Sequence, residues 1–245
     1  MLVAEVADGV LDVTLNRPEK RNALSRPLLR ELKRVLSEFA GADGLRAAVL
    51  RGAGAKSFAA GGDLRDLAQV RTREDTRRMA EEAHDALDAI RGFPVPVVAA
   101  LNGDALGGGA ELALACDVRV AASHAHIGFI QGRLNIVTAW GGGGDLMRLV
   151  GAARALHLLA AGELLDAAGA QRLGLVDAVG APGEPLQALI DRFIAPFLQQ
   201  APQVLRGFKA LAAAIRKGLP GAEIREIETR HLVETWVHPD HWQAA

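Results

Sequence analysis

Hydrophobic and polar residues alternate at the start of the chain and predict a β-hairpin. Residues 2–6 and 10–15 place apolar side chains at roughly every second position, which is the period of a strand with one buried face. Asp8-Gly9 lies between them and is a turn sequence, since glycine adopts the positive φ angles that tight turns need. We therefore expect two antiparallel strands joined by a short turn.

Three other apolar runs predict buried strands. Residues 46–51, 95–100 and 117–122 are short and rich in Val, Leu and Ala. Apolar character over so few residues is typical of strands that are covered on both faces.

The remaining periodic segments predict helices. Ser25 is a typical N-cap residue for a helix that runs to about Ala40. Charged residues from Arg71 to about Arg91 indicate a solvated helix. Further helices are expected at residues 145–150, over residues 156–170 with a turn at Gly162, and from about Glu184, Ala201 and Gly221.

Composition limits the class of protein. With 245 residues and 50% hydrophobic content, the chain can form one large domain with a smaller helical appendage. A formal net charge of −1 gives no electrostatic reason to expect nucleic acid or a membrane surface as a partner. The N-terminus is predicted to be a strand, not a signal peptide, and no apolar run approaches the roughly 18 residues of a membrane span. We therefore expect a cytoplasmic protein.

Cysteine and histidine residues add no chemistry to this picture. The single cysteine, Cys116, ends an apolar segment and is expected to be a core thiol. His124 and His126 alternate as metal ligands sometimes do, but no third ligand is evident beside them. No metal site is expected.

A glycine-rich junction at residues 101–114 is the strongest candidate for a functional site. It joins a predicted strand to an apolar helix, with Gly107, Gly108 and Gly109 at the junction and Glu111 in the first helical turn. Unpaired N–H groups at the positive end of a helix dipole suit a developing oxyanion. The alternative is an ordinary glycine-rich turn, with Glu111 serving only as a favourable first-turn acid.

A second junction of the same kind strengthens the functional interpretation. Residues 57–64 follow another predicted strand, contain Gly61 and Gly62, and end with Asp63 at a helix start. Two such junctions can supply two N–H donors to one oxygen.

Together these motifs resemble the enoyl-CoA hydratase/isomerase (crotonase) superfamily. The likeness rests on Phe58-Ala59-Ala60-Gly61-Gly62-Asp63-Leu64, on residues 102–112 and on Cys116-Asp117, and it extends from near residue 1 to about residue 237. It implies an α/β fold, the crotonase (ClpP-like) β-β-α superhelix, with a core domain at residues 1–180. It also implies a helical C-terminal trimerisation region at residues 181–245, and a homotrimer or a dimer of trimers.

The resemblance assigns an acyl-CoA thioester as substrate and requires no cofactor. The backbone N–H groups of Gly62 and Gly108 are expected to stabilise the thioester enolate. Contacts with substrate or coenzyme A are expected from Arg17, Lys20, Arg21, Ala60, Gly62, Asp63, Leu64, Gly107, Gly108 and Trp140. The alternative for Arg17, Lys20 and Arg21 is that they are ordinary surface cations. The short basic helix that often ends the family's members is expected to be absent here.

The catalytic acids depart from the family pattern. Hydratases of the family typically use two carboxylates twenty residues apart; the first is Glu111, and ungapped counting places Gln131 at the second. A glutamine can orient a water molecule but does not exchange a proton at neutral pH. Ala139 replaces the Asp of some dehalogenases and dienoyl-CoA isomerases, and the chain has no Tyr.

Three functions remain open from the sequence. The first is an enoyl-CoA hydratase-like lyase or isomerase with Glu111 as the evident acid or base and Gln131 beside it. The second is decarboxylation of a malonyl-type thioester, because residues 136–142 resemble those of ethylmalonyl-CoA decarboxylases, which also lack the second Glu. The third is a non-catalytic module that binds acyl-CoA.

Overall fold

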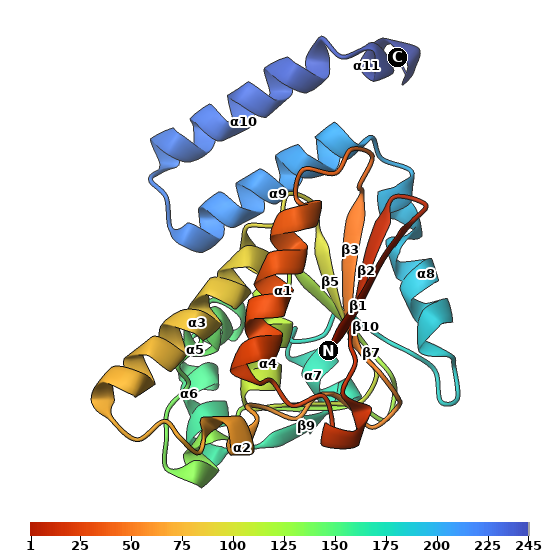
Figure 1. Ribbon diagram of the computed structural model, residues 1–245. Helices are drawn as coiled ribbons and strands as arrows, with labels where there is room; N and C mark the ends of the chain where they lie inside the picture. The colour runs from red at the N-terminus through yellow and green to blue at the C-terminus, as the bar shows by residue number, and fades with distance from the viewer. Residues whose placement is uncertain (245) are drawn as a thin grey trace.

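The computed structural model describes residues 1–244, and ten strands in this range form two sheets (Figure 1). The larger sheet has the order β1-β2-β3-β5-β7-β10. Its strands are β1 (Leu2–Ala7), β2 (Val10–Leu15), β3 (Ala47–Gly52), β5 (Val97–Leu101), β7 (Val118–Ala121) and β10 (Ala178–Val179). The smaller sheet contains β4 (Ser57–Ala59), β6 (Asp104–Leu106), β8 (His126–Gly128) and β9 (Leu164–Asp166).

The pairing of the larger sheet confirms the predicted hairpin. β1 and β2 are antiparallel, with Leu2 opposite Leu15 and Ala7 opposite Val10. From β2 onward, β3, β5, β7 and β10 are each parallel to their neighbour in the sheet. Parallel strands need long crossovers, so the helices between them cover the sheet.

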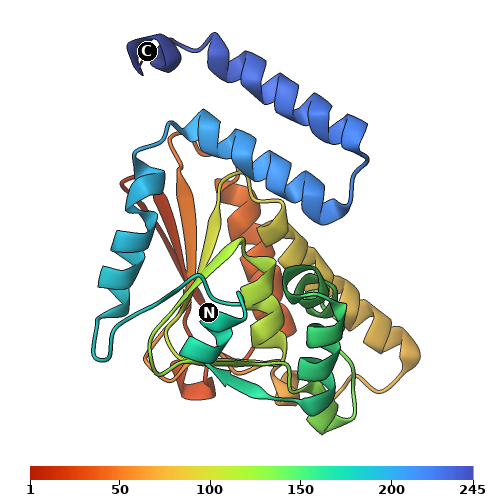
Figure 2. The same cartoon turned by 180° about the vertical axis from the view of Figure 1, so that it is seen from behind.

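Both faces of the larger sheet are covered, and this explains its continuous apolar runs. Ala48 and Leu50 of β3 face the main core, which includes apolar side chains of α1 (Arg26–Phe39) and α3 (Arg73–Arg91). Val49, between them, faces the second cluster, which contains Leu189 and other residues of α8 (Leu186–Leu198). Figures 1 and 2 show α1 and α8 on opposite sides of this sheet.

Several helix boundaries confirm the sequence prediction. The Ser25 hydroxyl accepts a hydrogen bond from the Leu28 N–H at the start of α1, as an N-cap does. The helices not yet named are α2 (Leu64–Leu67), α4 (Gly108–Ala115), α5 (Gly142–Val150), α6 (Ala152–Ala161), α7 (Ala167–Arg172), α9 (Pro202–Lys217), α10 (Gly221–Trp236) and α11 (Pro239–Ala244), with 3-10 turns at Pro18–Lys20 and Gln131–Leu134. Within residues 1–244, none of the helices is long and apolar enough to cross a membrane.

The structure corrects three details of the prediction. The segment expected to be helical over residues 156–170 is interrupted by the strand β9, which pairs with β8. The three-residue strands β4, β6 and β8 were not predicted, since they are too short to show a period of two. The chain also has a short last helix, α11, where none was expected, although it contains no Lys or Arg.

The C-terminal helices lie at one end of the molecule. In Figures 1 and 2, α9 crosses one end of the larger sheet and α10 runs beside α9 on the side away from the sheet. No residue of α10 is buried.

Candidate active site

The first glycine-rich junction begins α4, and each of its glycines meets a different steric constraint. Gly107 has φ +53° and precedes the helix, a conformation that favours glycine. A Cβ on Gly108 would lie 2.4 Å from an indole carbon of Trp140, and a Cβ on Gly109 would lie 2.0 Å from the Ala59 carbonyl oxygen. The three glycines therefore let β4, α4 and Trp140 pack in direct contact.

The second junction lies beside the first. Gly61 has φ +104°, and a Cβ there would lie 3.8 Å from the Gly108 nitrogen. Backbone hydrogen bonds with Leu24 hold the segment, because the Leu24 N–H donates to the Gly61 carbonyl and the Asp63 N–H donates to that of Leu24. Neither the Gly62 nor the Gly108 N–H has a hydrogen-bond acceptor within residues 1–244. Both predicted oxyanion donors are thus free and lie at neighbouring junctions.

Trp140 packs against both junctions. Its indole occupies the space that a Cβ on Gly108 would fill. Two atoms of the indole would also lie 3.8 and 3.9 Å from a Cβ built on Gly62. The side chain is buried, at 6% exposure. Trp140 therefore forms an apolar wall beside the two free N–H groups.

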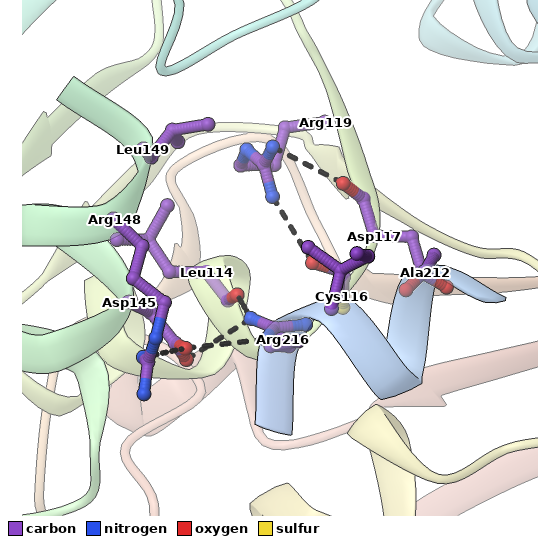
Figure 3. A pocket seen from close by; sticks show the side chains of 10 residues that line it. Leu114, Cys116, Asp117, Arg119, Asp145, Arg148, Leu149, Ala212 and Arg216 are labelled. Carbon is purple, nitrogen blue, oxygen red and sulfur yellow. Dashed lines mark hydrogen bonds and ion pairs between the residues drawn. The ribbon is translucent and has the colours of Figure 1, made fainter. Parts of the chain in front are cut away.

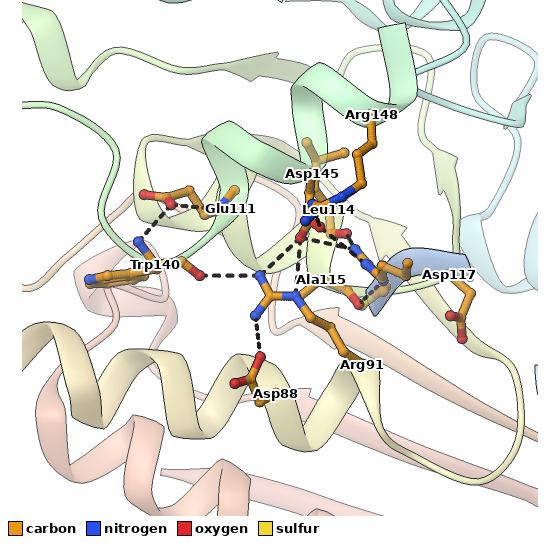
Figure 4. A network of polar contacts seen from close by, with 12 residues as sticks. Asp88, Arg91, Glu111, Leu114, Ala115, Asp117, Trp140, Asp145 and Arg148 are labelled. Atoms are coloured by element: carbon orange, nitrogen blue, oxygen red, sulfur yellow. Dashed lines mark hydrogen bonds and ion pairs between the residues drawn. The ribbon is translucent and has the colours of Figure 1, made fainter. Parts of the chain in front are cut away.

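Glu111 is buried in the first turn of α4, with 2% of its surface exposed. Its Oε2 accepts hydrogen bonds from the backbone N–H groups of Trp140 and Gly142, both at 2.9 Å. Its Oε1 accepts a third hydrogen bond from Gln131 Nε2, also at 2.9 Å. Figure 4 shows the Glu111 carboxylate beside the Trp140 backbone. A Cβ on Gly142 would lie 2.4 Å from Glu111 Cγ, so this contact requires glycine.

Gln131 contacts Glu111 as the spacing of twenty residues predicts. It begins the 3-10 turn Gln131–Leu134 and is 8% exposed. While its Nε2 donates to Glu111, its Oε1 is the buried side-chain polar atom left without a hydrogen-bond partner in the described part of the chain. An unmade hydrogen bond of this kind costs about 1–3 kcal/mol, so the site favours a ligand that brings an O–H or N–H group.

Burial controls the charge of Glu111. Loss of hydration raises the pKa of the Glu111 carboxyl above its usual value, and the hydrogen bonds from Gly142, Trp140 and Gln131 oppose this shift. A carboxyl with a raised pKa exchanges protons closer to neutral pH, which suits a general acid or base.

Arg17, which was expected either to contact coenzyme A or to be a surface cation, is buried in the structure. Its guanidinium is buried, forms an ion pair with Asp63 at 2.7 Å and donates to the Ala23 carbonyl at 2.6 Å. The same guanidinium holds the pKa of Asp63 below its usual range. Arg17 and Asp63 therefore connect the first loop to the Gly62 junction, whereas a phosphate contact needs a cation open to solvent.

The other expected contacts with coenzyme A have different surroundings. Lys20 and Arg21 are exposed to solvent, as a contact with a phosphate requires. Leu64 is 65% exposed at the start of α2. Ala60 is partly buried, and its N–H donates to the Arg21 carbonyl.

Two buried asparagines that the sequence analysis missed hold the loops together. Asn22 accepts a hydrogen bond from the Arg17 N–H and donates to the carbonyls of Ala53 and Ser57. Asn102 accepts from the Gly52 N–H and also donates to the Ser57 carbonyl. Asn102 lies in one of the motifs that carry the family resemblance, and this was the signal that the sequence offered for it.

Cys116 lies in a separate cavity of about 270 Å³ near the end of α4 (Figure 3). Burial raises the pKa of its thiol to about 12, so the thiolate is scarce at neutral pH. The thiol is therefore unsuited to nucleophilic chemistry. His124 and His126 contact the Ala55 carbonyl and Asp104, respectively.

A buried carboxyl and two free N–H groups at glycine junctions that follow β4 and β6, two paired strands of the smaller sheet, are features of the crotonase class of proteins. The family model described as enoyl-CoA hydratase/isomerase matches residues 5–243. The chain belongs to the enoyl-CoA hydratase/isomerase family.

Named relatives are similar over most of their length. A short-chain-enoyl-CoA hydratase of Clostridium acetobutylicum is 37% identical over 75% of this chain and 70% of its own. The mitochondrial enoyl-CoA hydratase domain-containing protein 2 of Mus musculus is 35% identical over 86% and 71% of the two chains. The solved structure of an enoyl-CoA hydratase from Bacillus anthracis superposes with a TM-score of 0.92, covering 99% of this chain and 93% of its own at 31% identity.

Proposed function

We propose that the protein catalyses an enoyl-CoA hydratase-like reaction with one proton-transferring carboxyl. The observation that carries this proposal is the buried Glu111 carboxylate, which accepts a hydrogen bond from the N–H of Trp140 and lies next to an unpartnered oxygen of Gln131. The Trp140 ring in turn packs against Gly62 and Gly108, whose N–H groups are free. The names of the relatives support the same class of reaction.

The geometry supplies a role for each group in the addition of water. A water molecule donates one O–H to Glu111 and the other to Gln131 Oε1, which fills the unmade hydrogen bond. As the water oxygen attacks Cβ of the enoyl group, Glu111 takes its proton and the double-bond electrons move onto the thioester oxygen. The Gly62 and Gly108 N–H groups stabilise that oxygen. Glu111 then returns the proton to Cα.

Isomerisation of a 3-enoyl thioester needs only part of this machinery. Glu111 would take a proton from Cα, the same two N–H groups would stabilise the enolate, and Glu111 would return the proton to Cγ. One carboxyl can perform both transfers in turn. Isomerisation is therefore an alternative to hydration that uses the same residues.

A second function, decarboxylation of a malonyl-type thioester, is favoured by one observation. Gln131 is neutral, so no second carboxylate beside Glu111 repels the negative charge of a substrate carboxylate. The bond to CO₂ breaks, its electrons move onto the thioester oxygen, and a protonated Glu111 donates its proton to Cα. The raised pKa of Glu111 increases the fraction that is protonated.

Mass spectrometry of the products separates these functions. The purified protein is incubated with crotonyl-CoA, a 3-enoyl-CoA in deuterated water, and malonyl-, methylmalonyl- and ethylmalonyl-CoA. Water gain supports the hydratase, and conversion of the 3-enoyl-CoA to the conjugated 2-enoyl-CoA, separated by chromatography, supports the isomerase. Loss of CO₂ supports the decarboxylase and overturns the first proposal. Binding of these thioesters without turnover contradicts an enzymatic function altogether.

A further inference from the structure

Within residues 1–244, Asp145 forms ion pairs with three arginines from three helices, and Arg91 is the one that also donates to the Trp140 carbonyl. Asp145 is 6% exposed and is paired with Arg91 of α3 and Arg148 of α5 (Figure 4) and with Arg216 of α9 (Figure 3). Arg91 donates from Nε and Nη2 to Asp145 Oδ2 at 3.1 and 2.9 Å. Its Nη2 also donates to the Trp140 carbonyl at 3.1 Å.

The Trp140 carbonyl lies at the centre of the segment that holds Glu111. It belongs to the peptide group between Trp140 and Gly141, and the two neighbouring peptide groups supply the N–H donors of Trp140 and Gly142. Fixing the plane of the middle peptide group therefore restricts the directions of both donors.

This segment needs an external anchor because it has few side chains of its own. Four glycines, Gly141 to Gly144, follow Trp140, and glycine is conformationally freer than other residues. Gly141 has φ +91°, and a Cβ there would lie 2.8 Å from Arg91 Nη2. Glycine at position 141 therefore leaves room for the Arg91 guanidinium to lie against the backbone.

We propose that Arg91 is a positioning residue for Glu111: anchored by Asp145, it fixes the Trp140–Gly142 backbone whose N–H groups hold the Glu111 carboxylate. The inference rests on the proposed role of Glu111 in proton transfer. Arg91 touches neither Glu111 nor the two oxyanion donors, so it acts through the backbone alone.

The test compares Arg91→Gln with Arg148→Gln as a matched control. Both changes remove a cation from Asp145, but Arg148 donates to Asp145 and not to the Trp140 carbonyl, and its side chain is 59% exposed. The readout that does not depend on activity is the pKa of Glu111, measured by ¹³C NMR with labelled Glu and assigned with Glu111→Gln.

In Arg91→Gln we expect the pKa of Glu111 to rise by about one unit, because its carboxylate loses well-directed N–H donors. We expect kcat to fall about 10- to 100-fold with little change in KM, as for a misplaced catalytic group. Arg148→Gln should leave the pKa of Glu111 and kcat close to those of the unaltered protein.

Arg91→Lys separates positioning from charge and covers the case in which Arg91→Gln does not fold. A lysine keeps the positive charge but lacks the fork that spans Asp145 and the Trp140 carbonyl, so it should restore the pKa of Glu111 only in part. Full restoration by lysine, or equal values in the Arg91 and Arg148 variants, would overturn the proposal. The pKa comparison decides this even if no acyl-CoA is turned over, whereas absent turnover counts against the proposed function alone.

Discussion

Gln131 donates a hydrogen bond to Glu111 at 2.9 Å where hydratases of this family typically place two carboxylates. The two side chains contact each other as a pair of carboxyls would, but only one of them, Glu111, is a titratable group. Because an amide does not titrate, every proton transfer assigned to this site depends on Glu111.

Gln131→Glu tests whether the missing carboxylate limits hydration. We expect hydration of crotonyl-CoA to rise about 10²–10⁴-fold, the usual contribution of general acid–base help. Two carboxyls at hydrogen-bond distance cannot both be ionised without cost, so one pKa of the pair should rise further and move the acid limb of the pH–rate profile. Kinetics from acidic to alkaline pH would reveal both effects. If the unaltered protein already hydrates crotonyl-CoA rapidly and Gln131→Glu does not increase that rate, the missing carboxylate does not limit hydration.

Glu111→Gln should remove turnover but stabilise the protein at neutral pH. The folded-state pKa of Glu111 is raised, so ionising it destabilises the fold progressively as pH rises above the unfolded value of about 4.3. The amide introduced at position 111 can still accept the two backbone N–H bonds, and the Gln131 amide can turn to accept its N–H.

Thermal unfolding between about pH 4 and pH 8 would measure this effect, since the range spans the ordinary glutamate pKa. The melting temperature of Glu111→Gln relative to the unaltered protein should increase with pH. A constant difference would show that burial of this charge does not destabilise the fold. Retained binding of an acyl-CoA thioester serves as the control for an intact site.

Gly62→Ala and Gly108→Ala should differ, although both keep their backbone N–H. At Gly62 the new methyl group meets the end of the flexible Leu67 side chain at 2.8 Å. At Gly108 it meets the Trp140 ring at 2.4, 2.8 and 3.0 Å, so overpacking should cost about 1–3 kcal/mol and displace the donor. Urea unfolding and kcat should show a nearly normal Gly62→Ala and an impaired Gly108→Ala. Equal behaviour of the two would be inconsistent with this packing.

The sequence was sufficient for features that depend on local pattern or fixed spacing. The hairpin, the buried strands β3, β5 and β7, and the cap at Ser25 each follow from residues close in the chain. The contact between Glu111 and Gln131 follows from spacing within a recognised motif.

Pairing between distant charges could not be read from the sequence. Arg17 has the same charge as Lys20 and Arg21, and only the fold shows that Arg17 is buried against Asp63. Arg91 ends a charged helix whose other cations are mostly exposed, so nothing in the pattern distinguishes it. Burial and partner identity depend on which segments meet in space.

The first-loop cations should divide into one that stabilises the fold and two that bind substrate. Arg17→Met leaves Asp63 buried and unpaired, which should cost about 3–5 kcal/mol of unfolding free energy. Lys20→Ala and Arg21→Ala should leave stability unchanged. If both contact phosphates of coenzyme A, each substitution should raise KM roughly 10- to 150-fold, since a charge-assisted hydrogen bond contributes about 1.5–3 kcal/mol. Denaturation curves and KM values are measured for all three variants. Equal effects of the three substitutions on stability and on KM would contradict the prediction.

We propose that the C-terminal helices form the contacts of a trimer. α10, α11 and the residues between them expose large apolar side chains that a monomer leaves in water: Leu232, Val233, Trp236, Val237 and Trp242. Light scattering should give three or six times the 25.8 kDa of one chain. Val233→Asp should lower that mass, because it would bury a charge at the interface. Val3→Asp, at an exposed valine of β1, is the matched control and should not. A mass of one chain for the unaltered protein, or equal masses for both variants, would contradict assembly through α10.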